Sequence, residues 1–152
     1  MSATSLRRTL IVLAAIGIAV AAYLTYIHYA DIKPICTTGG CEQVQSSAYA
    51  KLVGIPVALL GLIGYIAIMG SLLLAESENS RLLTMLLVLV GWGFSMYLTY
   101  REIFTIHAIC QWCVSSATIL TIMAILSVWR FLRGDVPAPA PSTAPAAADD
   151  GA

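Results

Sequence analysis

Residues 110–129 read CQWCVSSATILTIMAILSVW, a run without a charged side chain that opens with a pair of cysteines. Its apolar part, from about Gln111 to Trp129, is close to the ~20 residues with which an α-helix crosses ~30 Å of hydrocarbon. Three earlier stretches have the same character: Leu10 to about Tyr29, Leu52 to Ala75 and Leu82 to Tyr100. Helices satisfy their own backbone hydrogen bonds, which lipid cannot do. The sequence therefore predicts an all-α integral membrane protein, folded as a bundle of four transmembrane helices.

The composition agrees with a lipid bilayer as the main solvent. Of the 152 residues, 59% are hydrophobic and only 11% are charged, whereas soluble domains carry about 25% charge. The formal net charge is zero, so nothing in the sequence points to nucleic acid. We predict one membrane domain, residues 1–133, followed by a tail, residues 134–152, whose Pro-rich and Ala-rich sequence favours disorder.

The first span has a competing interpretation as a cleavable signal peptide. Arg7 and Arg8 precede the apolar run, and Ala19-Val20-Ala21 resembles a cleavage site. The run continues past that site through Leu24 and Ile27, which is long for a signal peptide and favours a retained helix.

Basic residues determine the expected topology, because they concentrate on the cytoplasmic side of membrane proteins. A cytoplasmic N-terminus places inside Arg7, Arg8, Arg81, Arg130 and Arg133, and it places outside Lys33, Lys51 and Arg101. We therefore predict that both termini are cytoplasmic and that the long loop of residues 30–51 lies outside.

All four cysteines fall on this predicted outer side. Cys36 and Cys41 lie in the long loop, and Cys110 and Cys113 form a CxxC pair where the fourth span begins. At a helix start, residues i and i+3 share a face, and the free amide groups and the helix dipole favour a thiolate. A thiolate attacks disulfides and is also a good leaving group. Two such pairs on one side of a membrane indicate reversible thiol–disulfide exchange.

Two alternatives stay open from the residues alone. The pairs could be structural disulfides in a non-catalytic membrane protein, since disulfides persist outside the cytosol. All four thiolates could instead bind zinc. Against zinc, the CxxC pair heads a membrane helix and encloses Trp112, whereas zinc knuckles usually sit on short turns in water.

The loop pair suits a mobile electron carrier. Gly39 and Gly40 permit a tight turn between Cys36 and Cys41, so a disulfide closes with little distortion. We expect a short interfacial helix within residues 42–51, and we expect Pro56 in the first turn of the second span. The loop dithiol could accept electrons from a partner protein and then visit the CxxC pair.

These motifs together resemble the vitamin K epoxide reductase family in its bacterial form, over roughly residues 10–131. The matching residues are Cys36 and Cys41, Glu42-Gln-Val44, Ser47-Ala-Tyr49-Ala50, Gly54-Ile-Pro56, Leu60-Gly61, Tyr97-Leu98, Arg101-Glu102 and Cys110-Gln-Trp-Cys113-Val114. The resemblance implies a four-helix bundle around a quinone of the menaquinone, ubiquinone or vitamin K type, in the bacterial cytoplasmic membrane. It also implies a thioredoxin-fold partner, which we expect to be a separate protein.

The same resemblance implies a role for each cysteine. Cys113 is expected to face the quinone and Cys110 to exchange disulfides with the loop, while Cys36 meets the partner and Cys41 reaches Cys110. Ser47 matches a hydroxyl residue of the family that supports chemistry at the quinone, with a helix cap as its alternative role. The expected function is a quinone-dependent thiol oxidoreductase that reoxidises its partner and so drives disulfide formation in secreted proteins.

Reduction of vitamin K epoxide by the same cysteine relay is the nearest alternative function. The animal enzymes that reduce the epoxide carry an Asn early in the second helix and a Tyr one turn after the CxxC pair. This chain has Val57 and Ala117 at those places, and these departures favour disulfide formation.

Three further predictions concern polar residues near the outer surface. His28 is interpreted as an interfacial residue, with a proton donor to the quinone as the alternative. His107 is interpreted as a loop residue, with stabilisation of a Cys110 thiolate as the alternative. Arg101 and Glu102 could form an interfacial ion pair.

Overall fold

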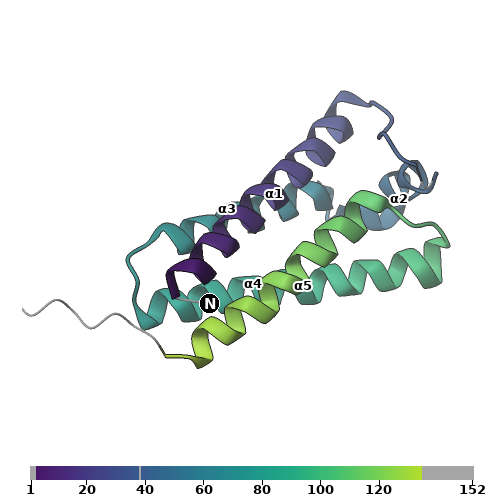
Figure 1. Cartoon of the computed structure of the whole chain (residues 1–152). Helices are drawn as coiled ribbons and strands as arrows, with labels where there is room; N and C mark the ends of the chain where they lie inside the picture. The colour runs from purple at the N-terminus through teal and green to yellow at the C-terminus, as the bar shows by residue number, and fades with distance from the viewer. Residues whose placement is uncertain (1–2, 38, 135–152) are drawn as a thin grey trace, which may run out of the picture.

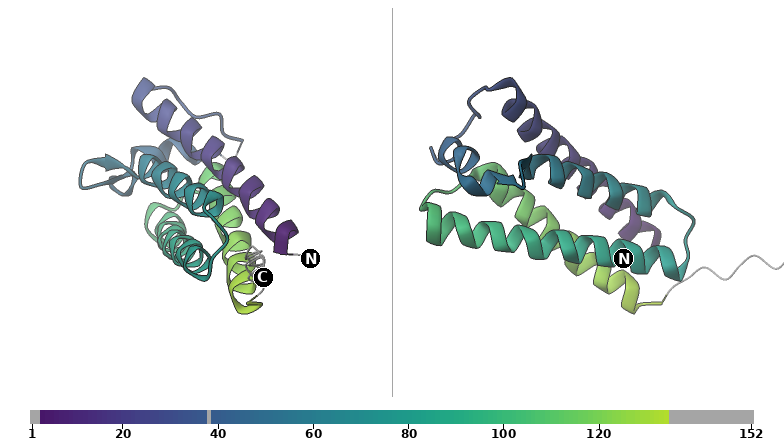
Figure 2. Two further views of the ribbon diagram at one scale, coloured as in Figure 1. Left: turned by 90° about the vertical axis from the view of Figure 1, so that its left-hand side faces the viewer. Right: turned by 180° about the vertical axis from the view of Figure 1, so that it is seen from behind.

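Four long helices lie side by side and alternate in direction (Figures 1 and 2). The computed structural model describes residues 3–37 and 39–134, and its long helices are α1 (Ala3–Ala30), α3 (Val57–Leu73), α4 (Glu78–Arg101) and α5 (Gln111–Leu132). Helix α1 packs against α3 and α5, and α4 packs against the same two helices. Each long helix therefore has two neighbours, and the four of them enclose a shared interior.

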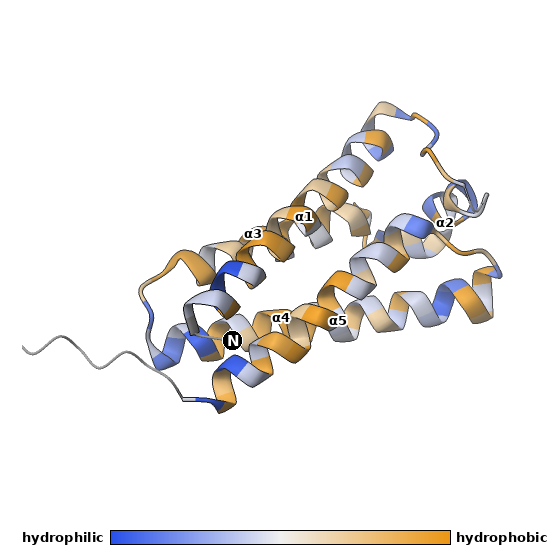
Figure 3. Ribbon diagram, viewed as in Figure 1, coloured by the Kyte–Doolittle hydropathy of each residue, from blue (hydrophilic) through white to orange (hydrophobic). Residues whose placement is uncertain are grey.

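Residues along the middle of the long helices are mainly hydrophobic, and hydrophilic residues gather toward the ends of the bundle (Figure 3). Three helical stretches are long and apolar enough to cross a bilayer: Thr4–Ala30, Glu78–Ile106 and Gln111–Leu132. Helix α3 is equally apolar but spans only 17 residues. Large side chains such as Val90 and Ile125 are 73% and 60% exposed, which water would disfavour and lipid would not. The chain is an all-α membrane protein.

The second predicted span, Leu52 to Ala75, is wrong at its start. Residues Lys51–Leu52 (β1) and Ile55–Pro56 (β2) form an antiparallel hairpin in which Lys51 pairs with Pro56. The two turn residues, Val53 and Gly54, have φ of 54° and 85°, a left-handed conformation that suits a two-residue hairpin turn and cannot continue a helix. Helix α3 therefore begins only after Pro56, which is its N-cap residue rather than part of its first turn.

The interior is formed by side chains from all four long helices, among them Leu10, Ala14, Tyr65, Val88 and Met123. Tyr65 is 3% exposed, and its ring lies directly against Gly17 of α1. A Cβ atom at position 17 would overlap this ring. Glycine at this position is what lets α1 and α3 approach closely enough to enclose the tyrosine.

At one end of the bundle, the carboxylate of Glu76, in the loop between α3 and α4, forms ion pairs with arginines from three helices. Arg81 and Arg130 donate to its two oxygens at 2.8 and 2.7 Å, and Arg7 Nε lies 3.6 Å away. The predicted inner set of basic residues thus supplies three members to one ion cluster. The cluster lies at the opposite end of the bundle from α2 (Figure 1).

The connection between α1 and α3 holds two short helical elements. Helix α2 (Cys41–Ser46) is followed by the 3₁₀ turn η1 (Ala48–Ala50), where the sequence predicted one short helix within residues 42–51. Between α4 and α5 lies a π-helical turn, η2 (Glu102–Ile106). The tail predicted to be disordered lies outside the described residues from position 135 onward.

Candidate functional site

The loop cysteines are joined to each other. Cys36 and Cys41 form a disulfide with their Cα atoms 6.0 Å apart. Gly39 between them has a φ of +77°, which glycine adopts without steric cost. Gly40 allows a close approach of a different kind, since a Cβ atom there would lie 2.6 Å from the carbonyl oxygen of Ile109. The two glycines therefore close the loop and bring it against the residue before Cys110.

The second cysteine pair, Cys110 and Cys113, lies at the start of α5. Cys110 is the N-cap residue of α5 and Cys113 lies in its first turn, and both are free thiols. The backbone N–H of Val114 donates to the Cys110 carbonyl at 3.0 Å, so the first turn of the helix is fully formed. Because residues i and i+3 share a face of a helix, the two thiols lie together and hydrogen-bond each other.

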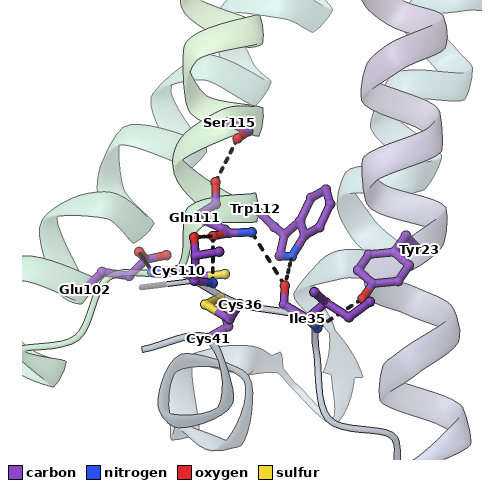
Figure 4. Close-up of a disulfide and its surroundings, with 10 residues drawn as sticks. Tyr23, Ile35, Cys36, Cys41, Glu102, Cys110, Gln111, Trp112 and Ser115 are labelled. Carbon is purple, nitrogen blue, oxygen red and sulfur yellow. Dashed lines mark hydrogen bonds between the residues drawn. A yellow bond between two sulfur atoms is a disulfide. The ribbon is translucent and has the colours of Figure 1, made fainter. Parts of the chain in front are cut away.

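All four cysteines meet in one cluster. Its buried members are Cys41, Val44, Ala108 and Cys110, and packed against them are Cys36, Ile106, Trp112 and Cys113. Cys41 and Cys110 are both 0% exposed, whereas Cys36 is half-exposed. The loop disulfide lies next to Cys110 in the close-up view (Figure 4).

The two residues between the CxxC cysteines hold the loop in this place. Gln111 Oε1 accepts hydrogen bonds from the Thr37 amide at 3.1 Å and from the Thr37 hydroxyl at 2.6 Å. Trp112 Nε1 donates to the Ile35 carbonyl at 2.8 Å, and its ring lies 4.9 Å from that of Tyr23 (Figure 4). The sequence analysis gave Gln111 and Trp112 no such role, and their contacts hold the loop pair against the helix pair.

Glu102 is a site residue whose position the sequence did not predict. Its carboxylate Oε2 accepts the backbone N–H of Cys110 at 3.2 Å, and the carboxyl group also contacts the Cys113 thiol. The predicted ion pair with Arg101 is absent among the described residues. Arg101 instead lies over the rings of Tyr49 and Tyr97, at 5.1 and 5.3 Å from their centres.

The π-helical turn η2 begins at Glu102 and leads the chain toward Cys110. The Ala108 amide donates to the Glu102 carbonyl at 3.2 Å, which is a wider closure than an α-helix makes. His107 then adopts a φ of 54° and ends the turn. Consecutive helical residues do not share a face, so Arg101 lies on the aromatic side and Glu102, which is 3% exposed, lies on the cysteine side.

The electrostatic surroundings make Cys110 the more acidic thiol of its pair. The hydrogen bond from Cys113 lowers the pKa of Cys110 below that of an ordinary cysteine, and it outweighs burial, which acts in the opposite direction. The start of α5 also favours negative charge at this place. Cys110 is therefore the sulfur better suited to exist as a thiolate.

A cavity of about 460 Å³ lies next to the cysteine cluster, between the four long helices. Its walls are mainly apolar and come from α1, α3, α4 and α5, together with α2, the segment after it and η2. The polar groups on its wall include Cys113, Glu102, Ser47, Tyr65 and Ser116. Its volume falls in the range of small-molecule sites, and one thiol of the CxxC pair faces it.

Ser47 and the two family departures have distinct positions. Ser47 lines the cavity, and its hydroxyl donates to the Val44 carbonyl at 2.7 Å while the residue ends α2. Both roles considered for Ser47 are thus compatible with its location. Val57 also lines the cavity, but Ala117 is buried and lies outside the residues that form its wall.

A second polar pair on the cavity wall was not anticipated. The hydroxyl groups of Tyr65 and Ser116 lie 2.9 Å apart, and both residues line the cavity. Ser116 follows Cys113 by three residues, so the pair lies about one helical turn deeper. The signal in the sequence was a tyrosine within an otherwise apolar span, which has to find a hydrogen-bond partner.

Neither histidine lies on the cavity wall. His28 is in the last turn of α1 and makes a ring contact with Tyr29 at 5.8 Å. His107 is exposed at the end of η2. These positions agree with an interfacial residue and a loop residue, the first interpretation given to each.

The family comparison covers the whole of this arrangement. The model of the vitamin K epoxide reductase family matches residues 8–128. The match includes both cysteine pairs, Glu102 and every residue of the cavity wall.

Proposed function

Since this chain belongs to the vitamin K epoxide reductase family, a family of membrane oxidoreductases, we propose that it is a quinone-dependent thiol oxidoreductase that reoxidises a thioredoxin-fold partner. The observation that carries the proposal is the meeting of both cysteine pairs in one buried cluster, with Cys113 on the wall of an apolar cavity. The loop disulfide, the CxxC thiols and the apolar cavity thus lie next to one another, in the order that electron transfer to a flat apolar molecule requires.

The burial of each sulfur supports an order of electron transfer. The partner thiolate attacks Cys36, the half-exposed member of the loop disulfide. The released Cys41 lies inside the cluster with Cys110 and attacks a Cys110–Cys113 disulfide. Cys113 then reduces the quinone. One dithiol of the partner becomes a disulfide, and the quinone gains two electrons and two protons.

The pairing in the structure corresponds to one stage of this cycle. The loop pair is oxidised while Cys110 and Cys113 are thiols. In the proposed cycle this is the stage at which the electron pair has left the loop and the quinone is the next acceptor.

The cavity suits a quinone on physical grounds. Quinone rings are flat and apolar, with two carbonyl oxygens that accept hydrogen bonds. The wall offers mainly apolar side chains, and its hydroxyl groups include those of Ser47, Tyr65 and Ser116. We propose that the ring lies against Cys113 and that an isoprenoid tail would leave between helices toward lipid.

We also propose that all four long helices cross the membrane, with α3 as the shortest span. Both ends of the described chain, and the arginine cluster around Glu76, then face the cytoplasm, because basic residues prefer that side. The cysteine cluster faces outward, where secreted proteins acquire disulfides. The proposed location is the bacterial cytoplasmic membrane.

Quinone reduction by the purified protein tests the proposal. The protein in detergent is mixed with a reduced thioredoxin-fold donor and a quinone, beside the Cys→Ser variant of each cysteine. We expect rapid reduction by the wild type, and its loss in both CxxC variants and in at least one loop variant. Ser115→Ala is the matched control, because Ser115 lies next to the pair but is exposed and bonds only the Gln111 carbonyl.

Two outcomes would contradict the proposal. One is a normal rate in Cys113→Ser, since no other thiol lies on the described cavity wall. The other is equal loss of folding in all four variants with no turnover in the wild type, which is expected of structural disulfides. Offering vitamin K epoxide in place of a quinone tests the alternative substrate, which Val57 on the wall disfavours.

A further inference from the structure

The proposed function leaves one buried ionisable group without a role. Glu102 is 3% exposed and lies on the cavity wall near the outer end of the bundle. The ion pairs found in the described part of the chain do not include it. Burying a carboxyl group without a cation is costly, and ionisable residues within membrane spans are mostly functional.

The neighbours of Glu102 are the two reacting thiols. Its Oε2 accepts the Cys110 backbone N–H at 3.2 Å, and its carboxyl group contacts the Cys113 thiol. The other cysteines of the cluster, Cys36 and Cys41, are in a disulfide and do not titrate. The nearest cation along the chain, Arg101, is turned toward Tyr49 and Tyr97. The titratable groups facing Glu102 among the described residues are therefore Cys110 and Cys113.

Glu102 also reaches the place where a quinone would lie. It shares the cavity wall with Cys113, so one carboxyl group borders both the proton donors and the proton acceptor of the reaction. Three of the other polar groups on the wall already have hydrogen-bond partners. The Ser47 hydroxyl donates to a backbone carbonyl, and the Tyr65 and Ser116 hydroxyls bond each other about one turn deeper.

We propose that Glu102 is a catalytic residue that carries protons from the Cys110–Cys113 dithiol to the quinone. The inference rests on the proposed function and adds to it a residue and a step that the four cysteines do not supply. General acid–base transfer by a placed carboxyl group requires hydrogen-bond reach of the proton, and Glu102 has that reach.

The step balances in protons and electrons. Two S–H bonds break and one S–S bond forms between Cys110 and Cys113, and the electron pair that this oxidation releases passes from Cys113 to the quinone. The Glu102 carboxylate takes the two thiol protons one after the other and delivers each of them to a quinone oxygen. Two thiols become one disulfide, the quinone becomes a quinol, and Glu102 returns to a carboxylate.

Glu102→Gln separates proton transfer from structural support. The glutamine side chain keeps an oxygen that accepts the Cys110 N–H, and it has nearly the size of glutamate, but it cannot carry a proton. Glu102→Asp keeps the carboxyl group on a shorter stem. Glu78→Gln is the matched control, because Glu78 is an exposed residue at the far end of α4.

The measurement is steady-state quinone reduction with a reduced thioredoxin-fold donor, with kcat and the KM for quinone determined separately. Exchange between the donor and the Cys36–Cys41 disulfide is followed in the same samples without quinone. We expect kcat of Glu102→Gln to fall about 100-fold or more, within the usual range of general acid–base catalysis. We expect its KM and its thiol exchange to be unchanged, Glu102→Asp to keep more activity, and Glu78→Gln to match the wild type.

The outcomes separate this inference from the proposed function. A wild type that reduces no quinone defeats the proposed function itself. A wild type that works beside a Glu102→Gln variant with the same kcat overturns the role of Glu102 alone. Equal loss in Glu102→Gln and Glu102→Asp, with both variants folded by thermal unfolding, also overturns it, because a shortened carboxyl group should retain part of the transfer.

Discussion

At the scale of single residues, the chemistry depends on which of the two thiols, Cys110 or Cys113, ionises more readily. A hydrogen bond from the Cys113 thiol lowers the pKa of Cys110, and burial only partly offsets it. A donor at position 113 is thus expected to hold the pKa of Cys110 down. Two substitutions at this position test that expectation.

The prediction compares Cys113→Ser with Cys113→Ala, each in a background where Cys36 and Cys41 are serine and only Cys110 can titrate. Serine still donates a hydrogen bond, so Cys110 should keep its lowered pKa. Alanine does not, so the pKa of Cys110 should rise. The ultraviolet absorbance of the thiolate, followed against pH, measures both, and identical titration curves would show that position 113 does not control Cys110.

The roles of the cysteines could be proposed from the sequence because their spacing carries the information. A CxxC pair at the start of an apolar span places two sulfurs on one helical face whatever the rest of the bundle does. No comparable spacing pattern in the sequence pointed to Glu102. It follows Arg101 directly, and the packing of the folded bundle decides the different surroundings of the two side chains. The turn η2 that follows depends on backbone hydrogen bonds that His107 and Ala108 donate to the Glu102 carbonyl, and no residue pattern predicts them.

At the scale of helices and strands, α3 shows where sequence patterns lose precision. Residues 52–56 are as apolar as the helix that follows them, so hydropathy extended the second span through them. The hairpin there rests on two residues with positive φ, Val53 and Gly54. Gly54 is a usual sign of such a turn, but a β-branched valine at positive φ is rare, and it concealed the turn.

The contact between α1 and α3 gives a prediction at this scale. In Gly17→Ala the added methyl group meets the Tyr65 ring, and either the ring or the helix must shift. We expect a loss of about 1–3 kcal/mol, typical of overpacking a tight interior. Thermal unfolding in detergent measures it.

Gly70→Ala provides the comparison for this contact. Gly70 is exposed on α3, and a Cβ atom there meets nothing within 4 Å. Alanine is also a better helix former than glycine. Gly70→Ala should therefore not destabilise the protein. Equal effects of the two substitutions would mean that the Tyr65 contact is not tight.

At the scale of the whole molecule, the two ends of the bundle have different tasks. The end with the cysteines holds the reactive groups, while the end around Glu76 joins α1, α4 and α5 to the loop that follows α3. Arg81 and Arg130 are 3% and 5% exposed, so their charges depend on this carboxylate. We expect this end to contribute stability and not activity.

Glu76→Gln tests that division. Removing one partner of a buried ion cluster costs up to about 3–5 kcal/mol, so the variant should unfold at a lower temperature while its quinone reduction at low temperature stays normal. Partial burial acts to raise the pKa of Glu76, but hydrogen bonds and charge from Arg130 and Arg81 together lower it. The stabilisation is therefore complete above the ordinary pKa of a glutamate and is lost as pH falls through the lowered one.

The pH dependence supplies the control for this prediction. The difference in unfolding temperature between the wild type and Glu76→Gln should be large at neutral pH and should shrink on acidification below about pH 4. Glu78→Gln, two residues away and exposed, should change stability by no more than about 1 kcal/mol. A difference that does not vary with pH would show that the charge of Glu76 is not what stabilises this end.

Cys41 and Cys110 are both without solvent exposure. Their burial limits which reductants can pass electrons to a quinone in the membrane. In the loop disulfide only Cys36 is partly exposed, and the next two sulfurs along the proposed route are insulated from water. A soluble reductant therefore enters the proposed route at Cys36. Under the proposed cycle, the surface around position 36 thus helps to select which proteins receive disulfides.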